Sequence, residues 1–452
     1  MFSRVLVANR GEIAVRVIRA LHELGVEAVA VYSTADSGAL HVALADQAVC
    51  IGPPAAGESY LRIPNLIAAA ETTGCEAIHP GYGFLSENPA FARACAESDL
   101  VFVGPTPEVM ERLGDKAAAK DEMRAAGVPL VPGTDGPASL AEVRSAAVEI
   151  GFPVMLKATA GGGGRGMRRV EGPEQLEEAY AAASAEADAA FGDGSLYLEK
   201  VVTPARHVEV QVLCDAEGGV LTLGERECSI QRRHQKLVEE SPSAAISSKT
   251  REELETSVAR ACASVGYLGA GTFEFLLGPD GGPYFIEVNC RLQVEHPVTE
   301  LVTGIDLVRA QLRIAAGEQL VRTGRAERRG HAIEVRINAE DPARGFAPAP
   351  GVVRRFRPPL GPGVRVDTAI EDGLEIPPYY DSLIAKVIVC DDDRPAAIAR
   401  AIRALDELEV EGIPTTRELA LDVLRSEGFA NGDYSTGYLD QMERHLPSLR
   451  PA

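Results

Sequence analysis

The stretch Glu287-Val-Asn-Cys-Arg-Leu-Gln-Val-Glu-His-Pro297 brings carboxylate, amide, guanidinium and imidazole groups together within eleven residues. It begins at the end of a strand that the sequence predicts over 283–288 and that we expect to be mostly buried. Another strand is predicted over 271–277, and Gly278-Pro-Asp-Gly-Gly282 between the two is typical of a turn. The two strands therefore predict a β-hairpin that carries this polar stretch.

The hairpin predicts a metal site. Pairing across a turn near Asp280 sets Glu274 roughly opposite Glu287, where two like charges destabilise a sheet. A divalent cation such as Mg²⁺ would remove this repulsion, because hard cations bind carboxylate oxygens and bridge phosphates. Asn289 lies on the same strand face as Glu287 and could supply a third oxygen. On the hairpin alone, a solvated polar strand face remains the alternative.

A glycine-rich loop predicts phosphate binding. A short apolar strand over 153–158 contains Lys157, and Gly161-Gly-Gly-Gly-Arg-Gly166 follows before a second strand-like run at 167–170. The backbone N–H groups of such a loop can cradle phosphate oxygens, with Lys157 at its base. The loop fits neither a dinucleotide fingerprint, since Gly172-Pro173 precede any helix, nor a Walker loop. A plain glycine-rich turn is the alternative.

Composition excludes several classes of protein. The 452 residues suggest about two to four domains or subdomains, and a hydrophobic content of 46% is ordinary for a globular chain. A net charge of −21 argues against nucleic acid and anionic membranes as partners. The eight cysteines form no C-x-x-C pair, which argues against structural zinc and a disulfide framework. Because neither a signal peptide nor a membrane-spanning apolar run is found, we expect a cytoplasmic protein.

The pattern of strands and helices changes along the chain. Residues 1–114 alternate the two, which predicts an α/β unit with a doubly wound parallel sheet. His79-Pro-Gly-Tyr-Gly83 ends one of these strands, at the edge where such sheets bind ligands. Residues 115–330 predict an α+β unit that includes a small lid at about 131–203. A C-terminal α+β unit follows over 331–446.

Three polar segments remain in these later units. Residues 207–212 alternate polar and apolar, which predicts a half-buried strand with His207, Glu209 and Gln211 on one face. Gln231-Arg-Arg-His-Gln-Lys236 is a basic run that is either a surface loop or an anion-binding segment. Residues 331–338 also alternate, with Glu334 and Arg336 on one face.

Taken together, these motifs resemble the biotin carboxylase component of acyl-CoA carboxylases, a family of the ATP-grasp fold. The resemblance covers about residues 2–446. It rests on the glycine loop, the 287–297 stretch, Ala8-Asn-Arg-Gly-Glu-Ile13, His79-Pro-Gly-Tyr-Gly-Phe-Leu-Ser-Glu-Asn88, Gly114-Asp-Lys116, Arg232-Arg-His-Gln-Lys236, Gly269-Ala-Gly-Thr-Phe-Glu274, Arg336-Ile-Asn-Ala-Glu-Asp341 and Pro377-Pro-Tyr-Tyr-Asp-Ser382. It implies an N-terminal biotin carboxylase domain at 1–114, an ATP-grasp domain at 115–330 with a mobile lid, and a biotin carboxylase C-terminal domain at 331–446.

The resemblance also implies a reaction and its partners. ATP, with Mg²⁺ or Mn²⁺, phosphorylates bicarbonate to carboxyphosphate, whose carboxyl group passes to N1′ of biotin. This is the first half-reaction of an acyl-CoA carboxylase in fatty acid biosynthesis. The implied partners are a biotin carboxyl carrier protein and a carboxyltransferase subunit, and the chain is expected to be a homodimer.

The family's functional residues map onto numbered positions of this sequence. The nucleotide positions are Lys116, Lys157, Gly162, Gly163, Gly164, Glu199, Lys200, Val202, His207, Gln231, His234 and Leu276. The metal positions are Glu274, Glu287 and Asn289, and the bicarbonate positions are Lys236, Arg291, Gln293 and Val294. The implied catalytic set is Glu295 as general base with Arg291, Arg336 and Lys236, while Tyr82 and Arg336 match the biotin site. For Glu295 the alternative is a surface ion pair with Arg291, and for Arg336 it is a pair with Glu334.

Two other functions stay open on the sequence. A carbamoyl phosphate synthase-like ligase would use ammonia, but its synthetase half is normally duplicated and this chain shows no repeat. A non-catalytic nucleotide sensor would be expected to lose Glu295 or Arg336, and both are present. Biotin carrier domains resemble one another in an Ala-Met-Lys-Met turn, whereas none of the six methionines here precedes a lysine. With the sequence ending at Ala452, we expect the biotin to arrive on another polypeptide.

Overall fold

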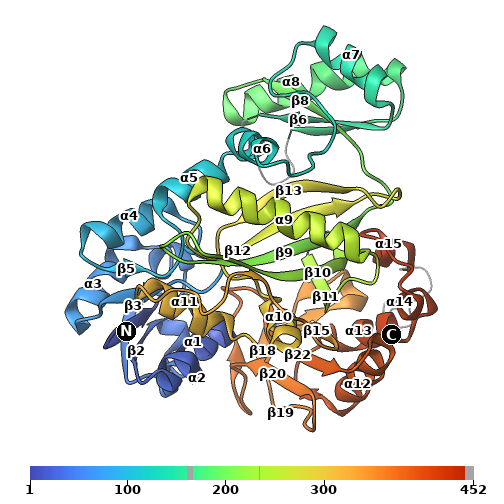
Figure 1. The fold of residues 1–452 in the computed structure, drawn as a ribbon. Helices are drawn as coiled ribbons and strands as arrows, with labels where there is room; N and C mark the ends of the chain where they lie inside the picture. The colour runs from blue at the N-terminus through green and yellow to red at the C-terminus, as the bar shows by residue number, and fades with distance from the viewer. Residues whose placement is uncertain (160–165, 234, 443–452) are drawn as a thin grey trace.

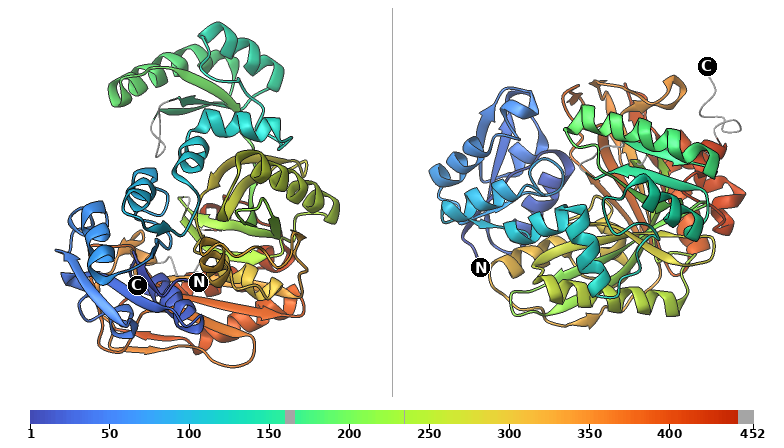
Figure 2. Two further views of the ribbon diagram at one scale, coloured as in Figure 1. Left: turned by 60° about the vertical axis from the view of Figure 1, so that its left-hand side comes forward. Right: turned by 90° about the horizontal axis from the view of Figure 1, so that it is seen from above.

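The computed structural model describes residues 1–159, 166–233 and 235–442. In Figure 1 a small lid stands at the top, above a large sheet that extends into the C-terminal part of the chain. The N-terminal unit, drawn in blue, lies beside the C-terminal strands, drawn in orange (Figure 2). Within the described part of the chain, every helix is too short or too polar to cross a lipid bilayer.

The N-terminal unit is a five-stranded parallel sheet, as the alternating pattern predicts. Its strand order β3-β2-β1-β4-β5 reverses direction at β1, which defines a doubly wound sheet with a ligand-binding edge beside β1 and β4. The strands are β1 (Arg4–Val7), β2 (Glu27–Ser33), β3 (Gln47–Gly52), β4 (Ala77–His79) and β5 (Val101–Phe102); the helices are α1 (Gly11–Glu23), α2 (Leu40–Leu44), α3 (Ile63–Thr73), α4 (Pro89–Glu97) and α5 (Pro107–Gly114). Sequence reasoning missed β3, an edge strand with a single buried residue.

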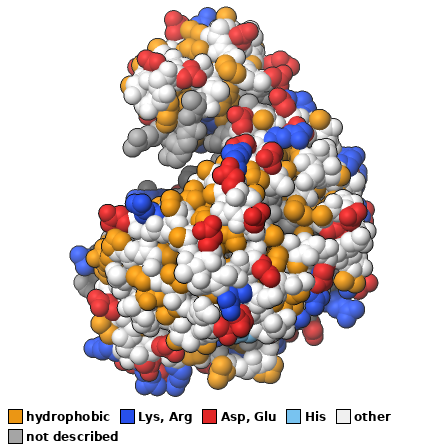
Figure 3. Space-filling model, turned by 90° about the vertical axis from the view of Figure 1, so that its left-hand side faces the viewer, with side chains coloured by type: hydrophobic (Ala, Val, Ile, Leu, Met, Phe, Trp, Pro, Cys, Tyr) orange, Lys and Arg blue, Asp and Glu red, His pale blue; other side chains and the backbone are white. Residues whose placement is uncertain are grey.

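The lid has a small sheet and an apolar core of its own. Strands β6 (Val154–Ala158), β7 (Met167–Val170) and β8 (Leu196–Lys200) form the antiparallel order β7-β6-β8. Helices α7 (Leu140–Ile150) and α8 (Leu176–Phe191) cover it, and the preceding helix α6 (Lys116–Ala125) joins it to the body. Helix α7 begins with a capping box, in which Ser139 and Glu142 each satisfy the other's backbone N–H. Figure 3 shows a hollow beneath the lid.

One nine-stranded sheet forms the centre of the molecule. Its order is β13-β12-β9-β10-β11-β15-β22-β20, with β14 paired to β10. The members are β9 (Arg206–Cys214), β10 (Val220–Arg232), β11 (Gln235–Ser241), β12 (Gly269–Leu277), β13 (Pro283–Asn289), β14 (Gly324–Arg325), β15 (His331–Asn338), β20 (Val364–Thr368) and β22 (Leu383–Asp391). The position predicted to begin the C-terminal unit, residue 331, therefore lies inside this sheet, because β15 pairs directly with β11.

Helices cover this sheet, and short elements complete the chain. Helix α9 (Ser248–Val265) packs on β10 and β9, while α10 (His296–Thr303) packs on β10, β11, β15 and β22. The remaining helices are α11 (Leu307–Ala315), α12 (Arg394–Glu407), α13 (Arg417–Arg425), α14 (Glu427–Asn431) and α15 (Tyr438–Met442). The remaining strands are β16 (Glu340–Asp341), β17 (Ala347–Pro348), β18 (Gly351–Val352), β19 (Arg355–Arg357), β21 (Glu375–Ile376) and β23 (Glu409–Glu411).

Candidate active site

A cavity of about 980 Å³ lies between the lid, the central sheet and the N-terminal unit. It brings together predicted site residues that are up to 254 positions apart, from Tyr82 to Arg336. Among the predicted site residues, its wall includes Tyr82, Lys157, Glu199, Lys200, Val202, His207, Gln231, Lys236, Glu274, Leu276, Glu287, Asn289, Arg291, Gln293, Val294 and Arg336. The predicted positions Gly162, Gly163, Gly164 and His234, and the side chain of Lys116, lie outside the described part of the structure.

The β12–β13 hairpin has the predicted register. Glu274 pairs directly with Glu287, and Thr272 pairs with Asn289. Strand β13 is only partly buried, so the expectation of a mostly buried strand is wrong: Glu287 is exposed because it faces the cavity. Carboxylate and amide oxygens from adjacent strands thus face one space, and this hard-oxygen donor set fits Mg²⁺ or Mn²⁺.

Glu274 also contacts the side chains of Lys236 and His207. Lys236 Nζ donates to Glu274 Oε1 at 3.1 Å, and His207 Nε2 lies 3.2 Å from Glu274 Oε2. Burial opposes ionisation of Glu274, but Lys236 and His207 outweigh it and lower its pKa. The carboxylate is therefore charged and available as a metal ligand.

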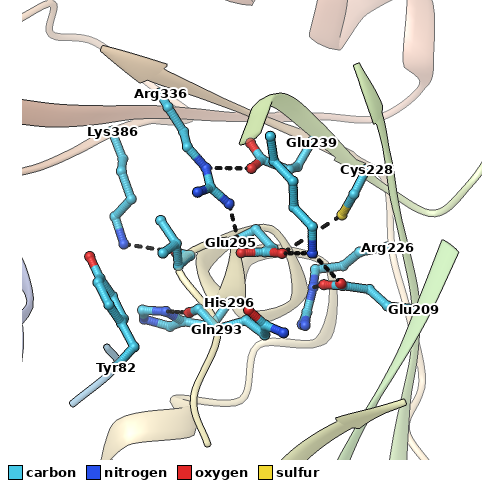
Figure 4. A network of polar contacts seen from close by, with 12 residues as sticks. Tyr82, Glu209, Arg226, Cys228, Glu239, Gln293, Glu295, His296, Arg336 and Lys386 are labelled. Atoms are coloured by element: carbon cyan, nitrogen blue, oxygen red, sulfur yellow. Dashed lines mark hydrogen bonds and ion pairs between the residues drawn. The ribbon is translucent and has the colours of Figure 1, made fainter. Parts of the chain in front are cut away.

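Glu295 lies beneath the cavity wall, at the N-cap of α10, and is 0% exposed. Lys236 Nζ donates to Glu295 Oε1 at 2.6 Å, and Arg336 Nη2 donates to Oε2 at 2.9 Å (Figure 4). The suggested surface pair between Glu295 and Arg291 is therefore wrong. Burial raises the pKa of Glu295, but Lys236, Arg336 and Arg226 outweigh burial and hold it well below its usual value.

Lys236 is the centre of a buried charge network. Besides Glu274 and Glu295, its ammonium donates to Glu209 Oε2 at 2.7 Å. Glu209 in turn accepts from Arg226 Nε at 2.5 Å, and both side chains are fully buried. Strand β9 is accordingly buried on both faces rather than half-buried as predicted, because Arg226 and α10 cover its polar face. The segment 231–236 is likewise not a simple surface loop, since Gln231 lies on β10, which ends at Arg232, and Lys236 lies on β11.

Arg291 pairs across the boundary between the units. Its Nε donates to Glu87 Oε2 at 2.8 Å, while its Nη atoms donate to Gln293 Oε1 at 2.9 Å and Asn289 Oδ1 at 3.0 Å. These contacts fix the guanidinium in the cavity wall, where it can donate to a planar oxyanion. Sequence reasoning did not single out Glu87, although it belongs to the quoted 79–88 motif.

Tyr82 is held by two further residues that the sequence analysis missed. Its hydroxyl donates to Glu12, and Lys386 lies 3.1 Å from the same carboxylate. Lys386 also donates to the carbonyl of Val294 at 2.9 Å, which links Tyr82, through Glu12 and Lys386, to the 287–297 stretch. A lysine in the centre of the apolar strand β22 is the sequence signal that could have revealed it.

The lid side of the cavity has its own ion pairs. Glu199 accepts from both Lys157 and Lys120, and Tyr197 stacks under Lys120 at 4.5 Å. Lys200 Nζ instead donates to the carbonyls of Gly151 and Phe152, at 2.9 and 3.1 Å. Lys120 was missed, although it lies four residues after Lys116 and so on the same helix face.

Three family models match successive parts of the chain. The biotin carboxylase N-terminal domain matches residues 1–110, the carbamoyl-phosphate synthase L chain ATP-binding domain matches 115–323, and the biotin carboxylase C-terminal domain matches 334–441. Among curated relatives, the biotin carboxylases of a Nostoc species and of Pseudomonas aeruginosa are each 53% identical, over 98% of this chain and 100% of theirs. A chloroplastic biotin carboxylase of Arabidopsis thaliana is 50% identical over 98% of this chain and 83% of its own length.

Solved structures agree with the sequence relatives. The biotin carboxylase domain dimer of Hydrogenobacter thermophilus 2-oxoglutarate carboxylase, in complex with MgADP, ADP and bicarbonate, superposes with a TM-score of 0.91 at 49% identity, covering 99% of this chain and 98% of that one. The Campylobacter jejuni biotin carboxylase–β-γ-ATP complex gives 0.92 at 48% identity, covering 98% and 99%. With matching domain models over most of its length and full-length relatives at about half identity, the chain belongs to the biotin carboxylase family.

Proposed function

We propose that this enzyme carboxylates biotin by coupling ATP hydrolysis to the activation of bicarbonate. The observation that carries the proposal is the contact of Glu295 with both Lys236 and Arg336 directly beneath the cavity. A buried carboxylate that is held ionised between two cations suits a base that acts on an anionic substrate. Bicarbonate is a poor nucleophile, so it needs both a base and a cationic clamp.

Glu295 is the proposed general base for bicarbonate. In the structure its basicity is suppressed by Lys236 and Arg336. A bicarbonate ion placed between Arg291 and Lys236 would draw part of the Lys236 charge to itself, and Glu295 would become a stronger base as a result. The clamp thus makes deprotonation depend on the presence of the substrate.

The opposite end of the cavity is the proposed nucleotide site. Lys157 and Lys120 now share the carboxylate of Glu199, and the γ-phosphate of ATP would offer them a stronger anionic partner. Glu274, Glu287 and Asn289 would hold Mg²⁺ or Mn²⁺, which neutralises the phosphate charge that develops during transfer. Lys116, the glycine loop, His234, His207, Gln231, Leu276, Lys200 and Val202 complete the proposed nucleotide set.

Biotin is proposed to enter beside Tyr82 and Arg336. Arg336 would stabilise the enolate that forms as N1′ loses its proton, because its guanidinium remains charged at any physiological pH. Each of the three units would then contribute to the site. The unit at 1–114 would supply Tyr82, the unit at 115–330 would supply the nucleotide and bicarbonate sites, and the unit at 331–446 would supply Arg336. We also propose that the lid at about 131–203 closes over the nucleotide and excludes water.

The biotin is proposed to be carried outside residues 1–452, on a carrier that also serves a carboxyltransferase. An acyl-CoA carboxylase is the assembly in which we place the enzyme. We further propose a homodimer, which is the arrangement named for the Hydrogenobacter domain. After co-expression with a biotin ligase, labelled streptavidin should detect no biotin on this chain. Strong labelling would contradict the separate carrier, and a monomeric mass by light scattering would contradict the dimer.

The reaction is tested by measuring ADP release while each component is withheld in turn. We expect release at full rate only with Mg²⁺, bicarbonate and biotin together, and a carrier-bound biotin should be a far better substrate than free biotin. Replacing biotin with ammonia separates the proposed activity from carbamoyl phosphate synthesis. Full ADP release without biotin and bicarbonate, or release that depends on ammonia, would contradict the proposal.

A further inference from the structure

Two buried glutamates behind Arg336 take no part in the mechanism described so far. Glu239 on β11 and Glu334 on β15 are directly opposed in the antiparallel register, and each is 0% exposed. Directly opposed residues lie about 5 Å apart, where two like charges repel and burial prevents water from screening them. Two charged carboxylates at this place would strongly destabilise the sheet.

The hydrogen bonds of the pair are unequal. Glu239 Oε1 accepts from Arg336 Nε at 2.6 Å, and the same guanidinium reaches Glu295 through its Nη2 (Figure 4). Glu239 Oε2 and both oxygens of Glu334 have no hydrogen-bond partner among the described residues. Three buried acceptor oxygens therefore lack a donor, and a single proton on Glu334 would supply one.

The charges that face the pair come from every neighbouring element. The charged groups are Arg336 on β15, Lys236 on β11, Lys386 on β22 and Glu295 at the start of α10. Cys228 on β10 and Tyr82 after β4 also face the pair, and both are neutral because their pKa values are raised well above the usual range. Burial, together with Glu295, raises the pKa of Glu239 to about 7 against the opposing effect of Arg336 and Lys236. Burial raises the pKa of Glu334 further, because Lys386 and Arg336 compensate for it only in part.

We propose that Glu334 is a protonated acid that donates its hydrogen bond to Glu239 Oε2, and that the ionised Glu239 held in this way is the positioning residue for Arg336. The inference rests on the proposed function, since Arg336 is the cation assigned to biotin. The pair anchors Nε of Arg336, so that Nη2 keeps its contact with Glu295 while the other face of the guanidinium meets the cavity.

The arrangement has a consequence for the pH dependence of the reaction. Glu239 must be ionised to hold Arg336, so activity should fall as the pH decreases through about 7. Without substrate, Glu295 is ionised across this pH range, because its pKa lies well below its usual value. If bound bicarbonate raises that pKa, the variants still identify the group, because only an acid limb set by Glu239 moves when Glu334 loses its hydrogen-bond donor. The acid limb of the rate therefore reports on Glu239 and, through the hydrogen bond, on Glu334.

The pH profile of kcat at saturating bicarbonate separates the states of the pair. Glu334→Leu removes the donor, so the acid limb should move to higher pH by about one to two units, which is the worth of one hydrogen bond to a charged group. Glu334→Gln keeps a donor and a neutral side chain, so the limb should stay within about 0.5 unit of its original position. Glu239→Gln should abolish the limb and lower kcat about 10–100-fold, with the Kd for ATP unchanged.

Glu240→Gln is the matched control, because Glu240 is buried on the other face of the same strand and bonds His331 and Arg394. It should lower stability and leave the acid limb in place. A limb that moves to lower pH in Glu334→Gln would show that Glu334 is charged. An unmoved limb in Glu334→Leu or in Glu239→Gln would show that the pair does not set it. Each of these results would overturn the proposal.

Infrared spectroscopy tests the pair without catalysis. The wild-type protein at neutral pH should show a C=O band of a buried protonated carboxylic acid that is lost in Glu334→Gln, even if Glu239→Gln fails to fold. If this band is found but the wild-type protein does not consume ATP with biotin, the proposed function is wrong, whereas the hydrogen bond between Glu334 and Glu239 is supported. If the wild-type protein is active but the band is unchanged in Glu334→Gln, Glu334 is not the protonated acid, whereas the proposed function is supported.

Discussion

Replacing Glu295 with glutamine tests the assignment of the base. The variant keeps the shape of the side chain but removes the charge to which Lys236 and Arg336 are bound, at 2.6 and 2.9 Å. The amide has only one acceptor oxygen, so one of the two cations must face an NH₂ group. Both cations keep other partners, however, since Lys236 still bonds Glu209 and Arg336 still bonds Glu239.

These contacts set the expected sizes of the effects. The loss of one hydrogen bond between charged groups should lower the free energy of unfolding by about 1–3 kcal/mol, so the protein should still fold. The loss of the general base should slow the chemical step by about 10²–10⁴-fold, or roughly 3–5 kcal/mol in activation free energy. ATP affinity should not change, because Glu295 lies beneath the cavity wall rather than in it.

The assay is single-turnover ADP formation at saturating bicarbonate and biotin, with the Kd for ATP measured by calorimetry. Glu209→Gln is the matched control, because it removes another carboxylate from Lys236 at nearly the same distance. It should slow the reaction much less than Glu295→Gln. If Glu295→Gln reacts within threefold of the wild type, or if Glu209→Gln is equally slow, Glu295 is not the base.

Three further predictions concern ATP, the lid and stability. Lys157→Ala should weaken ATP binding, since a phosphate loses its cation, whereas alanine at the exposed Lys249 should not; equal affinities by calorimetry would remove Lys157 from the site. Amide exchange in β6 and β7 should slow when an ATP analogue binds, and identical exchange with and without nucleotide would argue against a closing lid. Burial opposes ionisation of Glu240, but His331 and Arg394 outweigh it and lower its pKa from 4.5 to about 2. This charge therefore stabilises the fold above pH 4.5 and loses its effect as the pH falls towards 2. The melting temperature of Glu240→Gln should accordingly lie below that of the wild type at pH 7 and approach it in acid, and a difference that persists unchanged to pH 2 would refute the contribution.

The hairpin was predictable because its geometry is local. A five-residue turn sets the register beside it, so spacing places Glu274 roughly opposite Glu287. A register shift between Glu274 and Phe275, which spacing does not predict, then makes that pairing direct. The parallel sheet of residues 1–114 was predictable for a related reason, since each strand is followed closely by its helix. The missed strand β3 lies at the sheet edge, where its apolar residues are mostly not buried.

The centre of the site could not be predicted from pattern, because its contacts join distant segments. Lys236 meets Glu295 across 59 positions, and Arg336 meets Glu239 across 97. The alternation in 207–212 indicates one solvated face, yet that face is covered by Arg226 on the neighbouring strand and by α10, which comes much later in the chain. Only the family resemblance grouped Glu295, Lys236 and Arg336, and the structure shows that these three side chains are in contact.

The pairing of β11 with β15 limits where the chain can be divided into fragments that fold on their own. The matched family models end at residue 323 and resume at 334, which suggests a natural place to divide the chain. A chain cut there would expose the full hydrogen-bonding edge of β11, and such an edge invites association with other strands. The cut would also remove Arg336, so the buried carboxylates of Glu239 and Glu295 would lose the guanidinium that donates hydrogen bonds to both of them. The nucleotide-binding portion is therefore expected to aggregate when it is expressed alone, and family boundaries in this enzyme are poor guides to independently folding pieces.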